Sequence, residues 1–278
     1  MSDTTSWLEY IKAGDDASLA FIPSVPESVD EEVLEIEGAT VYVHRAPDVV
    51  EGGPIYLSLH PGGLINMGGE VCRRIGALSA LSMGMEVWSV DYRMPPIHPF
   101  PAGLDDSVAV YRHLVATKDP EDIFVSGVSA GGNIAAATLL LAKDEGLPMP
   151  AALYLGTPEL DLTESGDTFQ TLADADRALA SLKHVNQLYA AGQDLTHPYL
   201  SPLFGDVSGF PPTLLSSGTR DIFLSTTVRM HCKLRDAGVL ADLVVFEAMP
   251  HAGFSGGTPE DLQLQEEIRR FIHGHRRA

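Results

Sequence analysis

Residues 124–142 read FVSGVSAGGNIAAATLLLA, and this segment carries the strongest indication of the fold. It starts with apolar and small residues, as a buried strand does, and from Ala130 onward it is rich in Ala and Leu, as a helix is. Between the two lies GVSAG at 127–131, a G-x-S-x-G pattern. Its glycines permit a sharp strand-to-helix turn that exposes the Ser129 hydroxyl. The stretch predicts a nucleophilic serine, and the alternative is a glycine-rich turn that serves packing alone.

Short apolar segments alternate with helix-length segments around this turn. Strands that are apolar almost throughout and alternate with helices predict a parallel sheet covered on both faces. The segment 33–45 alternates polar and apolar residues, which predicts an antiparallel hairpin at the edge of the sheet. The predicted strands are 54–60, 85–92, 122–128, 151–157, 212–218 and 241–247, and three predicted helices are 104–117, 130–145 and 225–238.

Two segments do not fit the alternation. Residues 1–30 look helical but precede the sheet, and residues 160–205 interrupt it with polar and helical patches. Insertions at the carboxyl ends of parallel strands commonly cover a site there. We therefore expect one α/β domain over 1–278, with cap elements from about 1–30 and 160–205.

A serine nucleophile needs a histidine base and an acid that orients the base. In hydrolases with this turn the three residues follow in the order serine, acid, histidine, on loops after successive strands. Asp221 follows the strand 212–218, and His251 follows the strand 241–247. The other candidates lie inside or at the ends of helices or at the start of a strand: His231, His273, His275, Asp144, Asp236 and Asp242.

Elimination thus leaves Ser129, Asp221 and His251 as a catalytic triad. Taken singly, Asp221 has a simpler reading as a helix cap and His251 as an ordinary loop residue. Their joint occurrence in the required order favours the catalytic interpretation.

The tetrahedral intermediate of acyl transfer needs preorganised donors for its oxyanion. One is the backbone N–H of Ala130, directly after the nucleophile. LSLHPGGLINMGG, residues 57–69, leaves an earlier strand with four glycines in its last eight residues. Gly62 and Gly63 can offer two more N–H groups at close range because neither carries a side chain.

These motifs together resemble the esterases similar to hormone-sensitive lipase. HPGG at 60–63 resembles their HGGG loop, GVSAGGN at 127–133 their nucleophile turn, and VDYRMPPIHPFPAGLDD at 90–106 the stretch after their next strand. GTRDIFLS at 218–225 and PHAGF at 250–254 match their acid and histidine regions. The resemblance runs from about residue 54 to the end, and it implies an α/β-hydrolase fold: a mostly parallel central sheet flanked by helices, with a helical cap.

The resemblance also explains the proline in the glycine-rich loop. It implies that Gly62, Gly63 and Ala130 form the oxyanion hole, so Pro61, which has no N–H, removes no donor. His60 then shapes the loop rather than moving protons. Asp91, Tyr92 and Arg93 are expected to brace that loop by a buried ion pair and a turn.

Two positions and one stretch depart from the family pattern. Val128 stands where many relatives carry an acid, so a polar contact from that side chain is absent. Leu64 stands where an aromatic residue is common, which is expected to alter the acyl pocket. The wording TRDIFLSTTVR at 219–229 is closer to a branch that includes lactone hydrolases. Glu159 and Asp161 follow a predicted strand, and we expect them to fix the start of the cap rather than to touch substrate.

Composition excludes several other classes. The net charge of −20 disfavours nucleic acid or an anionic membrane as a partner. There is no secretory signal and no apolar run of membrane-spanning length, and Cys72 and Cys232 fall in helix-like stretches without a disulfide pattern. A cytoplasmic protein is therefore expected. The sequence shows no metal-ligand spacing, phosphate loop or dinucleotide fingerprint, so we expect no cofactor.

Together, the motifs, the resemblance and the composition predict a serine carboxylic-ester hydrolase that acts on short-chain esters or lactones through an acyl-enzyme on Ser129. Its substrate is expected to be a small molecule, and the resemblance implies a homodimer paired through an edge strand. Two alternatives stay open: an amidase or formamidase with the same triad, and a hydrolase-fold ligand receptor without turnover.

Overall fold

The computed structural model describes residues 3–47, 49, 52–254 and 256–276 of the chain. It contains an eight-stranded sheet in the order β1-β2-β4-β3-β5-β6-β7-β8. The strands from β4 onward in this order run parallel, and β2 is antiparallel to β1 and β4. The strand bounds are β1 Asp30–Ile36, β2 Ala39–Arg45, β3 Ile55–Leu59, β4 Glu86–Asp91, β5 Ile123–Val128, β6 Ala152–Gly156, β7 Thr213–Gly218 and β8 Ala241–Phe246.

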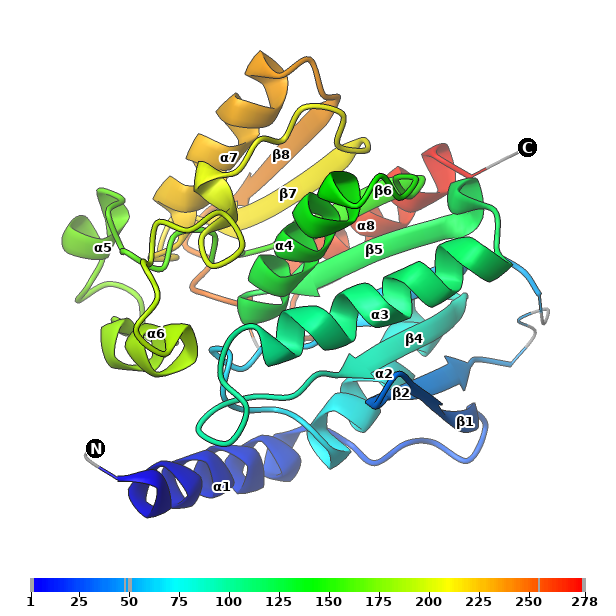
Figure 1. Ribbon diagram of the computed structural model, residues 1–278, viewed down its shortest axis with the longest axis horizontal. Helices are drawn as coiled ribbons and strands as arrows, with labels where there is room; N and C mark the ends of the chain where they lie inside the picture. Colours follow the sequence, from blue (N-terminus) through cyan, green and yellow to red (C-terminus); the bar gives the residue numbers. More distant parts are fainter. Residues whose placement is uncertain (1–2, 48, 50–51, 255, 277–278) are drawn as a thin grey trace.

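Helices cover both faces of this sheet, as Figure 1 shows. The connections between parallel strands supply most of them. The bounds are α1 Thr4–Phe21, α2 Glu70–Met83, α3 Ala102–Thr117, α4 Ala130–Asp144, α5 Thr168–Thr171, α6 Lys183–Ala190, α7 Leu224–Asp236 and α8 Pro259–Gly274, with 3₁₀ turns η1 Pro120–Asp122 and η2 Pro202–Phe204. No helix in the described ranges combines the length and the apolar character that a membrane crossing needs.

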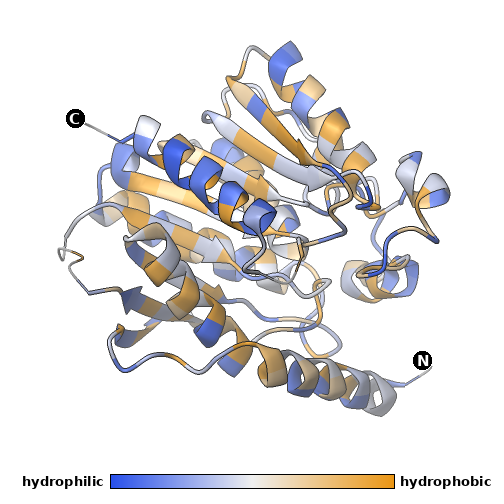
Figure 2. Cartoon of the chain, turned by 180° about the vertical axis from the view of Figure 1, so that it is seen from behind, coloured by the Kyte–Doolittle hydropathy of each residue, from blue (hydrophilic) through white to orange (hydrophobic). Residues whose placement is uncertain are grey.

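Alternate residues of the parallel strands build two separate cores. In β3, Leu57 and Leu59 belong to the core shared with α3, α4 and α7, whereas Tyr56 belongs to the core under α2 and α8. This follows from the two-residue period of a strand, which sends successive side chains to opposite faces. Both faces are apolar, and Figure 2 shows hydrophobic strands beneath an α8 that is hydrophilic on its outer side.

The predicted strands and helices are confirmed to within about two residues at each end. The segment 33–45 forms part of the β1–β2 hairpin, and β1 is an edge strand of the sheet. Most of β1 is exposed, and its buried residue is Ile36, because the strand lies at the edge of the sheet.

The expected cap segments lie on the side of the sheet toward which the arrowheads of β4 and β5 point in Figure 1. Residues 1–30 contribute α1, and residues 160–205 contribute α5, α6 and η2. Trp7 of α1, Ile65 of the glycine-rich loop and Val185 of α6 form a small core of their own. The two segments therefore meet over the loop that follows β3.

Candidate active site

The turn between β5 and α4 holds Ser129 in a backbone conformation that non-glycine residues seldom adopt, with φ 56° and ψ −122°. The glycines of the motif make the turn possible. A Cβ on Gly127 would collide with the carbonyl of Gly131, and a Cβ on Gly131 would collide with the carbonyl of Leu59. The G-x-S-x-G spacing is thus dictated by close backbone packing, and it places the serine at the carboxyl end of a central strand.

Ser129, His251 and Asp221 form a continuous hydrogen-bonded chain. The Ser129 hydroxyl lies 2.8 Å from Nε2 of His251, and Nδ1 of His251 lies 3.0 Å from Oδ1 of Asp221. Because a carboxylate accepts only, Nδ1 carries the proton and Nε2 is free to accept from the serine. All three residues are buried, and Asp221 is 0 % exposed. The three sequence candidates are brought together in the order that base catalysis needs.

Two further contacts fix Asp221. Its Oδ2 accepts a hydrogen bond of 2.7 Å from the Ser217 hydroxyl, and its Oδ1 accepts one of 3.0 Å from the Phe223 backbone N–H. The second contact closes a turn just ahead of α7, and the N-cap of α7 is Phe223, which has no side-chain cap. Asp221 is therefore not the helix cap that was the simpler alternative for it. The Phe223 ring meets the His251 ring edge-on, with centroids 4.8 Å apart. The carboxylate and the imidazole are therefore held in one orientation.

The loop after β3 carries Gly62 and Gly63, two of the residues expected to bind an oxyanion. Gly62 has φ +123°, and a Cβ there would collide with the carbonyl of Asn66, so only glycine fits. The backbone N–H groups of Gly62, Gly63 and Ala130 have no hydrogen-bond partner among the described residues. Gly62 and Gly63 line the same cavity as Ser129, and unpaired donors beside a nucleophile suit an oxyanion.

His60 and Tyr92 support the loop from beneath. Nδ1 of His60 donates to the Pro61 carbonyl at 2.7 Å, and the Tyr92 hydroxyl donates to the His60 carbonyl at 2.7 Å. The two rings stack with centroids 4.0 Å apart. Burial lowers the pKa of His60 to about 4, so its ring is neutral and shapes the loop.

Asp91, in the segment Asp91–Arg93, supports the end of the same loop at Gly69. Oδ1 of Asp91 accepts a hydrogen bond of 2.9 Å from the Gly69 N–H. Arg93 pairs with Asp106 at 2.7 Å, and the arginine remains 44 % exposed while the carboxylate is buried. The expected ion pair exists, but its cation lies at the surface because the guanidinium reaches the buried acid from outside.

Asp161 and Glu159 have different roles, which the sequence did not separate. Asp161 accepts hydrogen bonds from Thr163 and Ser165 and pairs with Arg229 at 3.1 Å, so it fixes the start of the second cap segment as expected. Glu159 does so only through its backbone, whose N–H donates to the Ser129 carbonyl at 3.1 Å. Its buried carboxyl has no hydrogen-bond partner among the described residues.

A cavity of about 490 Å³ opens over Ser129 and His251. It lies between the two expected cap segments, and its walls are mostly apolar. Lining side chains come from α1, the glycine-rich loop and the 178–185 segment: Tyr10, Ile65, Met67, Leu179, Leu182 and Val185. The cavity suits a small apolar group placed next to the serine.

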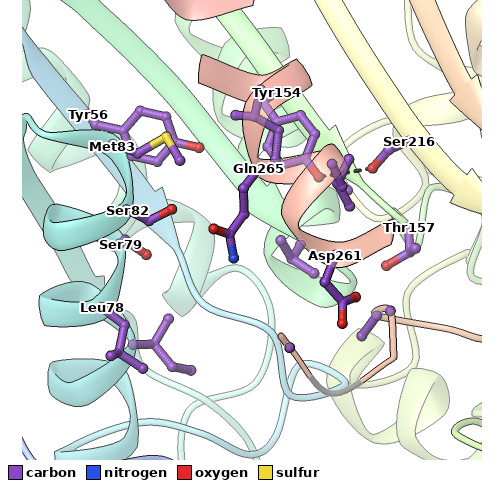
Figure 3. A pocket seen from close by; sticks show the side chains of 18 of the residues that line it. Tyr56, Leu78, Ser79, Ser82, Met83, Tyr154, Thr157, Ser216, Asp261 and Gln265 are labelled. Carbon is purple, nitrogen blue, oxygen red and sulfur yellow. Dashed lines mark hydrogen bonds between the residues drawn. The ribbon is translucent and has the colours of Figure 1, made fainter. Parts of the chain in front are cut away.

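A second hollow of about 360 Å³ lies behind the nucleophile turn, between α2 and α8 (Figure 3). Tyr154 and Ser216 share a hydrogen bond of 2.9 Å at one side of it, and Gln265 projects into its middle. Val128 lines this hollow and packs against the core under α8, so the second position of the nucleophile motif contributes no acid to this space, whereas Asp261 of α8 does line it. Ser129 and His251 do not line it, which leaves the first cavity as the place for a substrate.

A family model described as alpha/beta hydrolase fold matches residues 56–255. Among curated proteins, the chain is 34% identical to an acetyl-hydrolase of Streptomyces hygroscopicus over 226 residues, which cover 80% of this chain and 69% of the relative. It is 31% identical to carboxylesterase NlhH of Mycobacterium tuberculosis over 239 residues, covering 80% of this chain and 74% of that protein.

Solved structures of similar proteins superpose over nearly the whole chain. The esterase E25 has a TM-score of 0.91 at 35% identity, covering 100% of this chain and 88% of that one. The hormone-sensitive-lipase homologue EstE7, from a metagenome library, has a TM-score of 0.88 at 30% identity, covering 98% of each chain.

Proposed function

Since the chain belongs to the alpha/beta hydrolase fold family and its relatives are named esterases and acetyl-hydrolases, we propose that it hydrolyses short-chain carboxylic esters through an acyl-enzyme on Ser129. The observation that carries the proposal is the chain of hydrogen bonds from Ser129 through His251 to Asp221. It is the arrangement that activates a serine hydroxyl for acyl transfer.

In the first half-reaction His251 takes the Ser129 proton while the serine oxygen attacks the ester carbonyl. The N–H groups of Gly62, Gly63 and Ala130 bind the oxyanion, and Asp221 stabilises the imidazolium. His251 then returns the proton to the leaving alcohol. In the second half-reaction His251 deprotonates a water molecule, which attacks the acyl carbonyl. The bond from the acyl carbon to the Ser129 oxygen then breaks, His251 returns the proton to that oxygen, and the acid is released.

The acyl preference rests on the cavity above Ser129. The mostly apolar walls of this cavity of about 490 Å³ suit an apolar acyl chain, and the compact cap over it favours a short chain. Lactones, in which acid and alcohol belong to one molecule, are a second substrate class. The sequence of the acid region, which resembles the lactone-hydrolase branch, supports it.

Hydrolysis of p-nitrophenyl acetate, butyrate and octanoate, an ε-lactone and an anilide tests these points. The variant Ser129→Ala is compared with Ser18→Ala, which removes another hydroxyl from the same cavity, one that bonds to the Gly14 carbonyl within α1. We expect Ser129→Ala to lose at least about 10³-fold in kcat, Ser18→Ala to stay near wild type, and octanoate to be the poorest ester.

Other results assign the alternatives. Faster cleavage of the anilide than of every ester would favour an amidase. A folded wild type that cleaves none of the five compounds but binds them would favour a receptor.

A further inference from the structure

Three metal-binding side chains meet directly beneath the glycine-rich loop. His60 follows β3, Asp91 ends β4, and Cys72 lies in the first turn of α2, the helix that connects these strands. Because β3 and β4 are parallel neighbours with Leu59 opposite Val90, their next residues lie side by side. One ligand atom from each of His60, Cys72 and Asp91 lies within 4.8 Å of the other two.

His60 has a buried ring nitrogen, Nε2, that is available to a ligand. Its Nδ1 is 2.7 Å from the Pro61 carbonyl, which can only accept, so Nδ1 carries the hydrogen. In the neutral ring the lone pair is therefore on Nε2. This atom is buried and has no hydrogen-bond partner within the part of the chain that the structure describes. An orphaned, unprotonated imidazole nitrogen fits a cation better than it fits a packed core.

The other two groups complete a donor set for a thiophilic cation. Cys72 is 0 % exposed and forms no disulfide. Oδ1 of Asp91 accepts a hydrogen bond of 2.9 Å from the Gly69 N–H, and among the described residues Oδ2 accepts only a long contact of 3.4 Å from the Tyr42 hydroxyl. One nitrogen, one sulfur and one carboxylate oxygen suit Zn²⁺ or Cd²⁺ and suit Mg²⁺ or Ca²⁺ poorly.

We propose that His60, Cys72 and Asp91 bind one thiophilic divalent cation of the zinc class beneath the glycine-rich loop. The cation takes Nε2, Sγ and a carboxylate oxygen, and the thiol proton leaves to solvent. A water molecule fits the fourth position of the tetrahedron.

Binding should pull on the loop. Metal–ligand bonds of about 2.0–2.3 Å place tetrahedral ligand atoms roughly 3.2–3.8 Å apart. This separation is shorter than 4.8 Å, the distance within which the three ligand atoms lie in this structure. His60 directly precedes Pro61, Gly62 and Gly63, so its movement shifts the two glycine N–H groups relative to Ser129. If the proposed ester hydrolysis holds, the cation lowers kcat more than it changes KM, because misplaced oxyanion donors affect the transition state most.

The chain's second cysteine gives a matched control. Cys232 is exposed on α7, so in Cys232→Ser the thiol of Cys72 is the only one left. We titrate this variant with Cd²⁺ after treatment with EDTA and follow the ultraviolet charge-transfer absorption of a cadmium–thiolate bond. The expected result is a band that saturates at one Cd²⁺ per chain. Absence of the band in folded Cys232→Ser overturns the proposal.

A second variant, Cys72→Ala, should lose the band while keeping Cys232. A band of undiminished size in Cys72→Ala would assign the thiolate to Cys232 and contradict the proposal. If Cys72→Ala fails to fold, the titration of Cys232→Ser still tests the site. In the Cys232→Ser background, Asp91→Asn is expected to weaken Cd²⁺ binding at least about tenfold.

Activity is a separate readout. Zn²⁺ should lower the kcat of Cys232→Ser on p-nitrophenyl butyrate at least about tenfold, and EDTA should restore it. A cadmium band without any loss of kcat would retain the cation site and overturn its coupling to the loop. Absence of hydrolysis in metal-free protein would count against the proposed function alone, because the cadmium titration does not depend on turnover.

Discussion

Among the single residues of the triad, Asp221 acts through His251: its carboxylate orients the imidazole and does not itself attack the substrate. The substitution Asp221→Asn keeps the shape of the side chain but removes the charge and one acceptor facing Nδ1 of His251. The imidazole then loses its fixed tautomer and the stabilisation of its cation. We expect kcat for p-nitrophenyl butyrate to fall by about 10³–10⁴-fold with little change in KM.

Asp176→Asn is the matched control. Asp176 is also buried next to the loop that carries Asp221, and it accepts a hydrogen bond from the Ile222 N–H without contacting His251. Equal losses in the two variants would mean that Asp221 serves the fold of the segment and not the histidine.

Glu159 predicts a pH dependence of stability. Burial raises the pKa of its carboxyl to about 8, so the folded protein holds it neutral at pH 7 while the unfolded chain ionises it. A carboxyl whose folded pKa is raised lowers stability as pH rises from its ordinary value to that raised value. The free energy of unfolding should therefore fall by up to about 1.4 kcal/mol per pH unit across that window.

Urea unfolding at several pH values between about 5 and 9 measures this slope. Glu159→Gln should flatten it, and Glu9→Gln, on the exposed side of α1, should leave it unchanged. Identical slopes in wild type and Glu159→Gln would show that the carboxyl ionises freely in the folded state.

At the scale of the element, α1 holds the glycine-rich loop from outside the sheet. Oδ1 of Asp15 accepts a hydrogen bond of 2.7 Å from the Met67 N–H, and Asn66 Nδ2 donates to the Ile11 carbonyl at 2.9 Å. Removing the carboxylate should loosen the loop that carries Gly62 and Gly63. We expect Asp15→Ala to lower kcat about tenfold, the equivalent of one hydrogen bond in the transition state.

Asp16→Ala is the control, because Asp16 is exposed on the same helix and pairs only with Lys12. Its kcat should match the wild type. A normal kcat in Asp15→Ala would show that the loop keeps its shape without α1.

The elements that the sequence predicted best are those with a strong local signal. The turn at Ser129 combines a strand, two sterically required glycines and a helix, and these are local features. The positions of Asp221 and His251 followed from strand order. Contacts made across the fold had no such signal: the hold of Asp15 on the loop joins residues 52 apart. The cluster of His60, Cys72 and Asp91 likewise shows no ligand spacing along the chain, because a parallel strand pair and its crossover helix create it.

At the scale of the whole molecule, the net charge of −20 acts against the compact state through self-repulsion. The ion pairs at the surface offset little of this, since an exposed pair contributes about 0–1 kcal/mol. Raising sodium chloride from about 10 mM to about 150 mM shortens the Debye length from roughly 30 Å to 8 Å. We expect the midpoint of thermal unfolding to rise over that range, and to rise equally in potassium chloride.

A fall in the midpoint with added salt would mean that attractive pairs dominate the electrostatic free energy. The balance would then favour the networks around Arg45 and Arg73, each of which contacts more than one carboxylate.

The central claim is that Ser129 is the nucleophile, and covalent labelling tests it most directly. The wild type and Ser129→Ala are treated with a fluorophosphonate, digested, and the modified peptide is identified by mass spectrometry. We expect one phosphonyl group per wild-type chain, on Ser129, and none in folded Ser129→Ala. A label on another residue, or equal labelling of both proteins, would contradict it.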